Sequence, residues 1–208
     1  METRSSFKLL KNREGVGRVD LLKSTRSQIL IAVLLIALIF AARLLPHAAN
    51  FTPVAAVGLF AGVYLRGKWA PFLPLAGLFL SDLFIGGYGI RGMTIVYGAF
   101  IFTFLIGKIM ARRGVFNSNG KFGAKFMRVF GGAIASSVLF FIVTNNIFLY
   151  TPAFYPMTFD GMIASYVMGI PFFRNQILGD LIYSGALFGA YEVARVLSAR
   201  FALRSVES

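Results

Sequence analysis

The chain has 208 residues, of which 57% are hydrophobic and only 14% charged, and its mean hydropathy is +0.74. A soluble domain of this size carries about a quarter charged residues, so the composition is that of a membrane protein. There is no cysteine and one histidine, which excludes disulfides, thiolate chemistry and a Cys/His zinc site within one chain, and no metal or cofactor is expected.

Apolar stretches predict six membrane-spanning helices, which cover residues 28–45, 53–66, 70–87, 93–110, 128–150 and 174–198. Most approach the roughly 20 residues that cross a bilayer core, whereas 53–66 is short and has to tilt or use its flanks. The predicted fold is therefore all-α, a polytopic bundle of six transmembrane helices. It forms one domain over residues 28–198, with a basic tail over 1–27 and a second tail over 199–208.

The net charge of +13 follows this topology. Six spans place both termini on one side, and the segments on that side hold all of the 21 Lys and Arg residues except Arg43, Arg91 and Arg174. The positive-inside rule then predicts a multi-pass membrane protein with both termini in the cytoplasm. Anionic lipid headgroups of the bilayer, rather than nucleic acid, are the expected partners of this charge.

The first polar connection is RLLPHAANFTP, residues 43–53, on the predicted outer side. Pro46 and Pro53 end one helix and start the next at a set angle, and Asn50 lies where a cap of the second helix belongs. For Asn50 and the prolines, a stiff capped turn is at least as good an interpretation as a ligand site. His47 indicates a site only together with its neighbours.

Charged side chains recur in the outer half of three predicted helices. Asp82 lies about 6 Å from the end of the third helix, and Asp180 lies roughly 9 Å inside the sixth. A charge in the membrane core costs about 2.5–3.5 kcal/mol, so such residues usually face the bundle interior and pair. The charged residues expected to converge are Arg43, Asp82, Arg174 and Asp180, and the polar residues proposed to bind beside them are Asn50, Asn145, Asn175 and His47.

Two interpretations of this cluster remain open at the level of sequence. In one, the arginines neutralise the aspartates in a buried ion-pair network that only fixes packing. In the other, the cluster forms an outward-facing polar pocket that binds a small molecule.

The segment 151–173 is too apolar for a solvated loop. Its apolar residues recur at helical spacing from Phe159 to Ile170, and Asp160 suits a helix N-terminus. We expect an interfacial helix over the outer end of the bundle, which serves either as a lid or as a membrane anchor.

Catalytic motifs are missing from the sequence. It contains no GxSxG, no HExxH and no phosphate-binding loop, and Asp180 in QILGDLI lacks the GxGD context of an intramembrane protease. We therefore expect a protein that is not an enzyme, and any uphill transport draws its energy from a partner or an ion gradient.

Four stretches in order, RLLPHAANFTPVAAVGLFAG, PLAGLFLSDLFIGG, VTNNIF and PFFRNQILGDLIY, resemble an uncharacterised bacterial family of membrane transport proteins over about residues 28–195. That family is in turn similar to the substrate-binding S components of energy-coupling-factor vitamin transporters. The resemblance implies a ligand held near the outer surface under the connections 43–53, 86–92 and 151–173. It also implies that Ala37 and Ala41 dock on a transmembrane coupling subunit with ATPases.

The function expected from the resemblance is capture of a small polar, vitamin-like organic nutrient from the outer side. The alternative is a non-transport membrane protein, such as an assembly or lipid-interacting subunit, whose outer charges are structural.

Overall fold

The computed structural model describes residues 21–22, 24–87, 89–113, 122–149 and 154–207. All regular secondary structure in these ranges is helical, which confirms the all-α prediction. The helices are α2 (Thr25–Leu44), α3 (Val54–Tyr64), α4 (Leu73–Ile85), α5 (Ile90–Arg112), α6 (Phe122–Thr144) and α7 (Phe159–Glu207), with 3-10 turns η1 (Ala70–Phe72) and η2 (Ile147–Leu149). Most of the predicted tail 1–27 lies outside the described residues, and α7 continues through the predicted tail 199–208 as far as Glu207.

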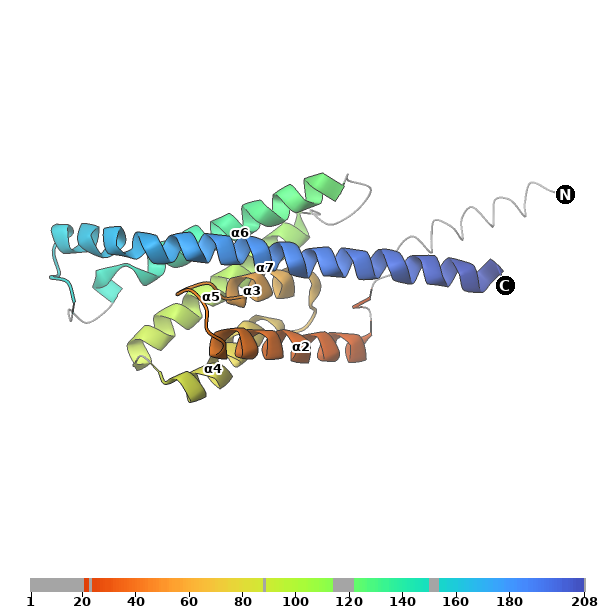
Figure 1. Ribbon diagram of the computed structural model, residues 1–208, viewed down its shortest axis with the longest axis horizontal. Coiled ribbons are helices and arrows are strands. Elements are labelled where there is room, and N and C mark those ends of the chain that lie inside the picture. The colour runs from red at the N-terminus through yellow and green to blue at the C-terminus, as the bar shows by residue number, and fades with distance from the viewer. Residues whose placement is uncertain (1–20, 23, 88, 114–121, 150–153, 208) are drawn as a thin grey trace.

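The helices run alternately up and down the bundle (Figure 1). α2 begins and α7 ends at one end, on the right of Figure 1, which we call the terminal end. α2 ends and α5 begins at the opposite end, which we call the distal end. α3 is the central helix, because nine of its 11 residues are buried and it packs mainly against α5 and α7. α2 packs mainly against α4, and α6 packs against α5 and α7.

Glycines allow α3 and α5 to approach closely. A Cβ atom at Gly62 would overlap the carbonyl oxygen of Phe104, and one at Gly107 would overlap the carbonyl oxygen of Leu59. Small residues at a helix crossing let two backbones come into contact, which is a common way to join helices in lipid. This contact fixes the centre of the bundle, around which the other helices are arranged.

The separate interfacial helix predicted over 159–170 does not exist as such. It and the predicted sixth helix form one helix, α7, of 49 residues with Pro171 inside it. At 1.5 Å per residue α7 is about 74 Å long, more than twice the thickness of a bilayer core. The first part of α7 is therefore neither an independent lid nor an independent anchor, but a continuation of the helix that carries Asp180.

A proline inside a helix removes one hydrogen bond and costs about 3 kcal/mol or more, so Pro171 favours a break in α7. Contacts with α6 hold both sides of Pro171 in line. Before the proline, the Tyr166 hydroxyl donates to the Ile142 carbonyl at 2.7 Å. After it, Phe173 stacks on Phe141 with 4.4 Å between the ring centroids. Tertiary packing thus overrides the local signal.

Three helical segments are long and apolar enough to cross a membrane, namely Thr25–Leu44, Ile90–Arg112 and Gly123–Thr144. α3 has 11 residues and α4 has 13, fewer than the roughly 20 that a span needs. On α2, large apolar side chains such as Leu30 and Leu34 are more than half exposed. These features suggest association with a membrane, and the count of six spans stays a prediction.

Candidate functional site

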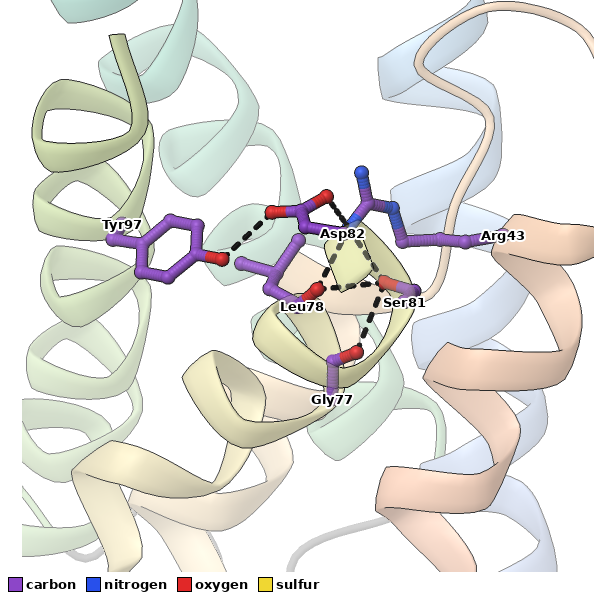
Figure 2. Close-up of polar contacts among 6 residues, drawn as sticks. All are labelled: Arg43, Gly77, Leu78, Ser81, Asp82 and Tyr97. Carbon is purple, nitrogen blue, oxygen red and sulfur yellow. Dashed lines mark hydrogen bonds and ion pairs between the residues drawn. The ribbon is translucent and has the colours of Figure 1, made fainter. Parts of the chain in front are cut away.

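An ion pair joins α2 to α4 near the distal end (Figure 2). The Nη1 atom of Arg43 lies 2.7 Å from the Oδ1 atom of Asp82, and the two side chains are 15% and 3% exposed. From α5, the hydroxyl of Tyr97 donates a hydrogen bond of 2.6 Å to the other carboxylate oxygen, Oδ2. The Arg43 contact is electrostatic in character, because Oδ1 accepts no well-aligned hydrogen bond. Three helices are therefore tied together at one carboxylate.

The same Arg43 nitrogen also donates to a backbone carbonyl and a side-chain hydroxyl of α4. Nη1 donates to the Leu78 carbonyl at 3.2 Å and to the Ser81 hydroxyl at 2.7 Å. The guanidinium makes all of these contacts through Nη1, whereas its Nε and Nη2 have no partner among the described residues. Asp82 thus accepts a hydrogen bond at Oδ2 and has only the ion pair with Arg43 at Oδ1, and Arg43 keeps part of its donor capacity.

Two glycines set the position of Tyr97 opposite Asp82. α4 ends at Gly86 with φ of 94° and α5 begins after Gly89 with φ of 83°. Glycine adopts this left-handed region without strain, so the chain can reverse within a few residues. Tyr97 then lies about two turns into α5, at the level of Asp82 one turn before the end of α4.

Asp180 does not join this network. Its side chain is 2% exposed and lies between α6 and α7, where the Ser137 Oγ atom is 2.6 Å from its Oδ2 atom. Arg174 is exposed and forms no ion pair within the described part of the chain. Six residues of helix place Arg174 and Asp180 about 120° apart around α7, which explains why they do not meet. Of the four charges expected to converge, the structure pairs only Arg43 with Asp82.

The connection between α2 and α3 packs on one face of α7. The Asn175 side chain donates to the Ala49 carbonyl at 3.2 Å, and one turn later a Cβ atom at Gly179 would lie 3.3 Å from the Cα atom of Phe51. A further turn along, the rings of Phe51 and Tyr183 are 5.6 Å apart. Asn175, Gly179 and Tyr183 thus form a face of α7 that holds the connection against the bundle.

Asn50 belongs to the turn itself and not to a helix cap. It has a positive φ of 64°, a conformation that asparagine tolerates better than most residues. Pro53 occupies the N-cap position of α3, and no side chain caps that helix. The predicted capping role of Asn50 is therefore wrong.

A cavity of about 620 Å³ opens at the distal end of the bundle between α2, this connection and α7. It is lined by Leu38, Ala41, Ala42, Leu45, Pro46, His47, Ala48, Phe51 and Tyr183. Its wall is mostly apolar, and none of the four charged residues expected at the site lines it. Of the predicted site residues, the cavity contains only His47 and the predicted docking residue Ala41.

Two polar groups in the cavity wall are available to a ligand. The Nδ1 atom of His47 lies 2.6 Å from the Leu45 carbonyl oxygen, a contact in which Nδ1 donates, and Nε2 has no partner among the described residues. The Tyr183 hydroxyl has no hydrogen-bond partner among the described residues. His47 and Tyr183 are thus the residues with polar side chains in a lining that is otherwise apolar.

Asn145 has a packing role away from this cavity. Its side chain donates to the Phe141 carbonyl at 3.0 Å within α6, and its own carbonyl accepts a 2.9 Å hydrogen bond from the Ser165 hydroxyl of α7. At Gly169 a Cβ atom would overlap the Asn145 side-chain oxygen. Asn145 therefore holds the first part of α7 against α6.

Several residues that matter here were not found from the sequence. Tyr97 and Tyr183 carry no signal of their own, since tyrosines are common in membrane helices. Ser137 has a weak signal as part of a serine pair in α6. At the terminal end, Glu192 binds Arg195 at 2.7 Å and Lys125 at 3.7 Å, and a buried acid near the end of an apolar helix is a signal that sequence analysis can use.

The two alanines predicted to dock on a partner are both exposed. Neither Ala37 nor Ala41 is buried by the helices that pack on α2. The pair is therefore not needed for internal helix contacts in this structure.

Comparison with known proteins places the chain in a family. A search of curated proteins and a search of solved structures found no match. One family model, described as a family of unknown function (DUF6580), matches residues 23–202. This range includes residues of all six described helices together with the cavity and the Arg43–Asp82 pair. The chain belongs to the DUF6580 family of unknown function.

Proposed function

We propose that this protein is a membrane transport protein that captures a small organic nutrient, in the manner of an S component. The distal end is assigned to the outer side of the bacterial cytoplasmic membrane, with six spans and both termini in the cytoplasm. The observation that carries the proposal is the open cavity of about 620 Å³ at the distal end. Its volume lies within the range of about 300–1,000 Å³ that is usual for small-molecule sites.

The lining of the cavity defines the class of ligand. Leu38, Ala42 and Phe51 offer apolar surface, and Nε2 of His47 and the hydroxyl of Tyr183 offer hydrogen bonds. This combination fits a molecule with an apolar ring or chain and one or two hydrogen-bonding groups. It does not fit a highly charged ligand, because no charged side chain lines the cavity.

Entry of the ligand is assigned to the connection 45–53, which forms one wall of the cavity. This wall is held on α7 by the Asn175–Ala49 hydrogen bond and by the contact of Phe51 with Tyr183. A few contacts of this kind open at small cost, and loops with few contacts are common gates. Release to the inside is assigned to an energised coupling subunit that docks on Ala37 and Ala41.

A ligand screen on purified protein tests this proposal. Vitamins and related nutrients are added in turn, and the shift of the unfolding midpoint is measured, since a ligand that binds only the folded state raises it. The variant Ala42→Leu extends a side chain into the cavity from α2 and is expected to abolish the shift. The matched control, Val33→Leu, changes a side chain on the exposed face of the same helix and is expected to keep it. A ligand that stabilises wild type and Ala42→Leu equally binds elsewhere and refutes the assignment of this cavity.

A second function is favoured by a specific observation. The Arg43–Asp82–Tyr97 network joins three helices and has the form of a structural clamp. This favours a non-transport membrane protein, for example an assembly or lipid-interacting subunit, in which the distal charges only maintain the bundle. Failure of every nutrient in the screen, together with capture of a membrane complex by the intact protein, supports this function instead.

A further inference from the structure

The carboxyl group of Asp180 is buried between α6 and α7 without a cationic partner. Its neighbours are the Ser137 hydroxyl, 2.6 Å from Oδ2, and the Gln176 side-chain amide. No charged side chain of the described residues forms an ion pair with it. The other buried acid of the distal half, Asp82, is paired with Arg43. Of these two buried acids, Asp82 therefore has a cationic partner and Asp180 has none among the described residues.

The contacts of Ser137 are compatible with a proton on Asp180. The Ser137 Oγ atom lies 3.1 Å from the Ala133 carbonyl oxygen and 2.6 Å from Asp180 Oδ2. The serine hydroxyl has a single proton, so it can donate to only one of these two acceptors at a time. A protonated carboxyl group of Asp180 can donate to Ser137 in its turn, and both contacts are then hydrogen-bonded. A carboxylate would leave one of the two contacts without a hydrogen.

The cost of burying a charge also favours a proton on Asp180. An ionised carboxylate buried without a cation is so costly that such groups usually take up a proton instead. Gln176 and Ser137 are neutral hydrogen-bonding groups and do not supply the missing charge. A proton on Asp180 removes the charge and satisfies the geometry at once.

Tyr183 follows Asp180 by three residues on α7 and is a neighbour on the helix surface. The other charged or titratable groups on the packed elements include Lys125 and Arg128 on α6, Tyr64 on α3, His47 in the connection 45–53, and Arg174, Tyr191 and Glu192 on α7. Arg128 is nine residues, or about 13 Å, from Ser137 along α6, and Tyr64 contacts Tyr191, about 16 Å from Asp180 along α7. Phe188, which is 2% exposed, lies on α7 between Asp180 and Glu192.

We propose that Asp180 is a proton-binding site, which carries a proton in the described conformation and releases it when the contact between α6 and α7 loosens. In the release step the carboxyl O–H bond breaks, the proton passes to a water molecule as hydronium, and a carboxylate remains. Ser137 keeps its own proton and rotates its hydroxyl from the Ala133 carbonyl to Asp180. Uptake is the reverse, and no other reactant is needed.

Ser184 supplies a second hydroxyl that can donate to Asp180 when its carboxyl group is ionised. Ser184 lies one turn beyond Asp180 on the same buried face of α7, is fully buried, and has no partner for its Oγ atom within the described part of the chain. A buried hydroxyl without a partner is costly, so its presence needs an explanation. Here it serves as a second donor to the carboxylate. In transport the proton would be a coupling ion, a role that rests on the proposed function, whereas the site itself does not.

Infrared spectroscopy of the full-length protein in lipid nanodiscs tests the proposal. At neutral pH wild type is expected to show the carbonyl stretch of a buried protonated carboxyl. The band should be lost in Asp180→Asn and kept in the control Asp82→Asn. In Ser137→Ala the band should remain but shift, because the hydrogen bond from the carboxyl is removed. Raising the pH is expected to remove the band reversibly while the helical signal stays.

Three results would overturn the proposal. The first is no protonated-carboxyl band in wild type at neutral pH. The second is a band that persists up to the pH at which the protein unfolds, which describes a fixed neutral acid. The third is a band removed by sodium ions at constant pH, which describes a metal-cation site. If Asp180→Asn does not fold, the frequency of the carboxyl band in Ser137→Ala is the test. A band at the wild-type frequency in that variant comes from another group and overturns the proposal. None of these results depends on whether a nutrient binds in the cavity.

Discussion

The Arg43–Asp82 pair gives a test of whether the distal charges are structural or serve a pocket. Arg43→Met leaves the Asp82 carboxylate, which is 3% exposed, with only the Tyr97 hydroxyl as a partner. Removing one member of a buried pair typically costs about 3–5 kcal/mol because an uncompensated charge stays behind. We expect a loss of this size in the free energy of unfolding.

The opposite replacement is expected to cost less. In Asp82→Asn the stranded charge is that of Arg43, which is more exposed and keeps its hydrogen bonds to Leu78 and Ser81. Its Nε and Nη2 atoms can also turn to water, so the loss is expected to be about 1–2 kcal/mol. The double variant strands neither charge and should recover much of the larger loss.

The free energy of unfolding is measured for wild type, both single variants and the double variant, by denaturant titration in detergent micelles followed by circular dichroism. Arg174→Met is the matched control, since Arg174 is exposed and outside any ion pair of the described residues, and its effect should stay within about 0.5 kcal/mol. Equal losses for the two single variants, or a double variant no better than Arg43→Met, would refute the argument from unequal burial. Small losses throughout would show that water reaches the pair, as the pocket interpretation requires.

Two further predictions concern topology and docking. Single cysteines are introduced at Arg91, near the distal end, and at Lys68, between α3 and η1, both of which are exposed. In intact cells a membrane-impermeant thiol reagent should label position 91 and not position 68, and the reverse result contradicts the proposed orientation. The native chain has no cysteine that would add background. Ala37→Leu should weaken co-purification with a coupling subunit without changing ligand binding. Ala41→Leu should change both, because Ala41 also lines the cavity. If Ala37→Leu co-purifies as well as wild type, docking at this position loses its support.

Helix content could be predicted from sequence because apolar length and proline or glycine boundaries are local signals. The continuity of α7 could not, because it depends on contacts of Tyr166 and Phe173 with α6 on either side of Pro171. Local rules describe what Pro171 costs, but they contain no information on what packs beside it. The predicted interfacial helix failed for this reason alone.

In the candidate site, the charged residues could be predicted from residue type, whereas the cavity depends on how the helices pack. Arg43 and Asp82 were found because a charge in an apolar helix must be paired, whatever the fold. The failure to pair Arg174 with Asp180 has a different origin, since helical phase already separates them by about 120° and a count of charges per helix ignores phase. The cavity could not be found at all, because Leu38, Ala42 and Phe51 are ordinary apolar residues until the fold leaves space between them. Polar residues thus mark where the bundle is held together, and the cavity forms where small and apolar side chains fail to fill the gap between α2 and α7.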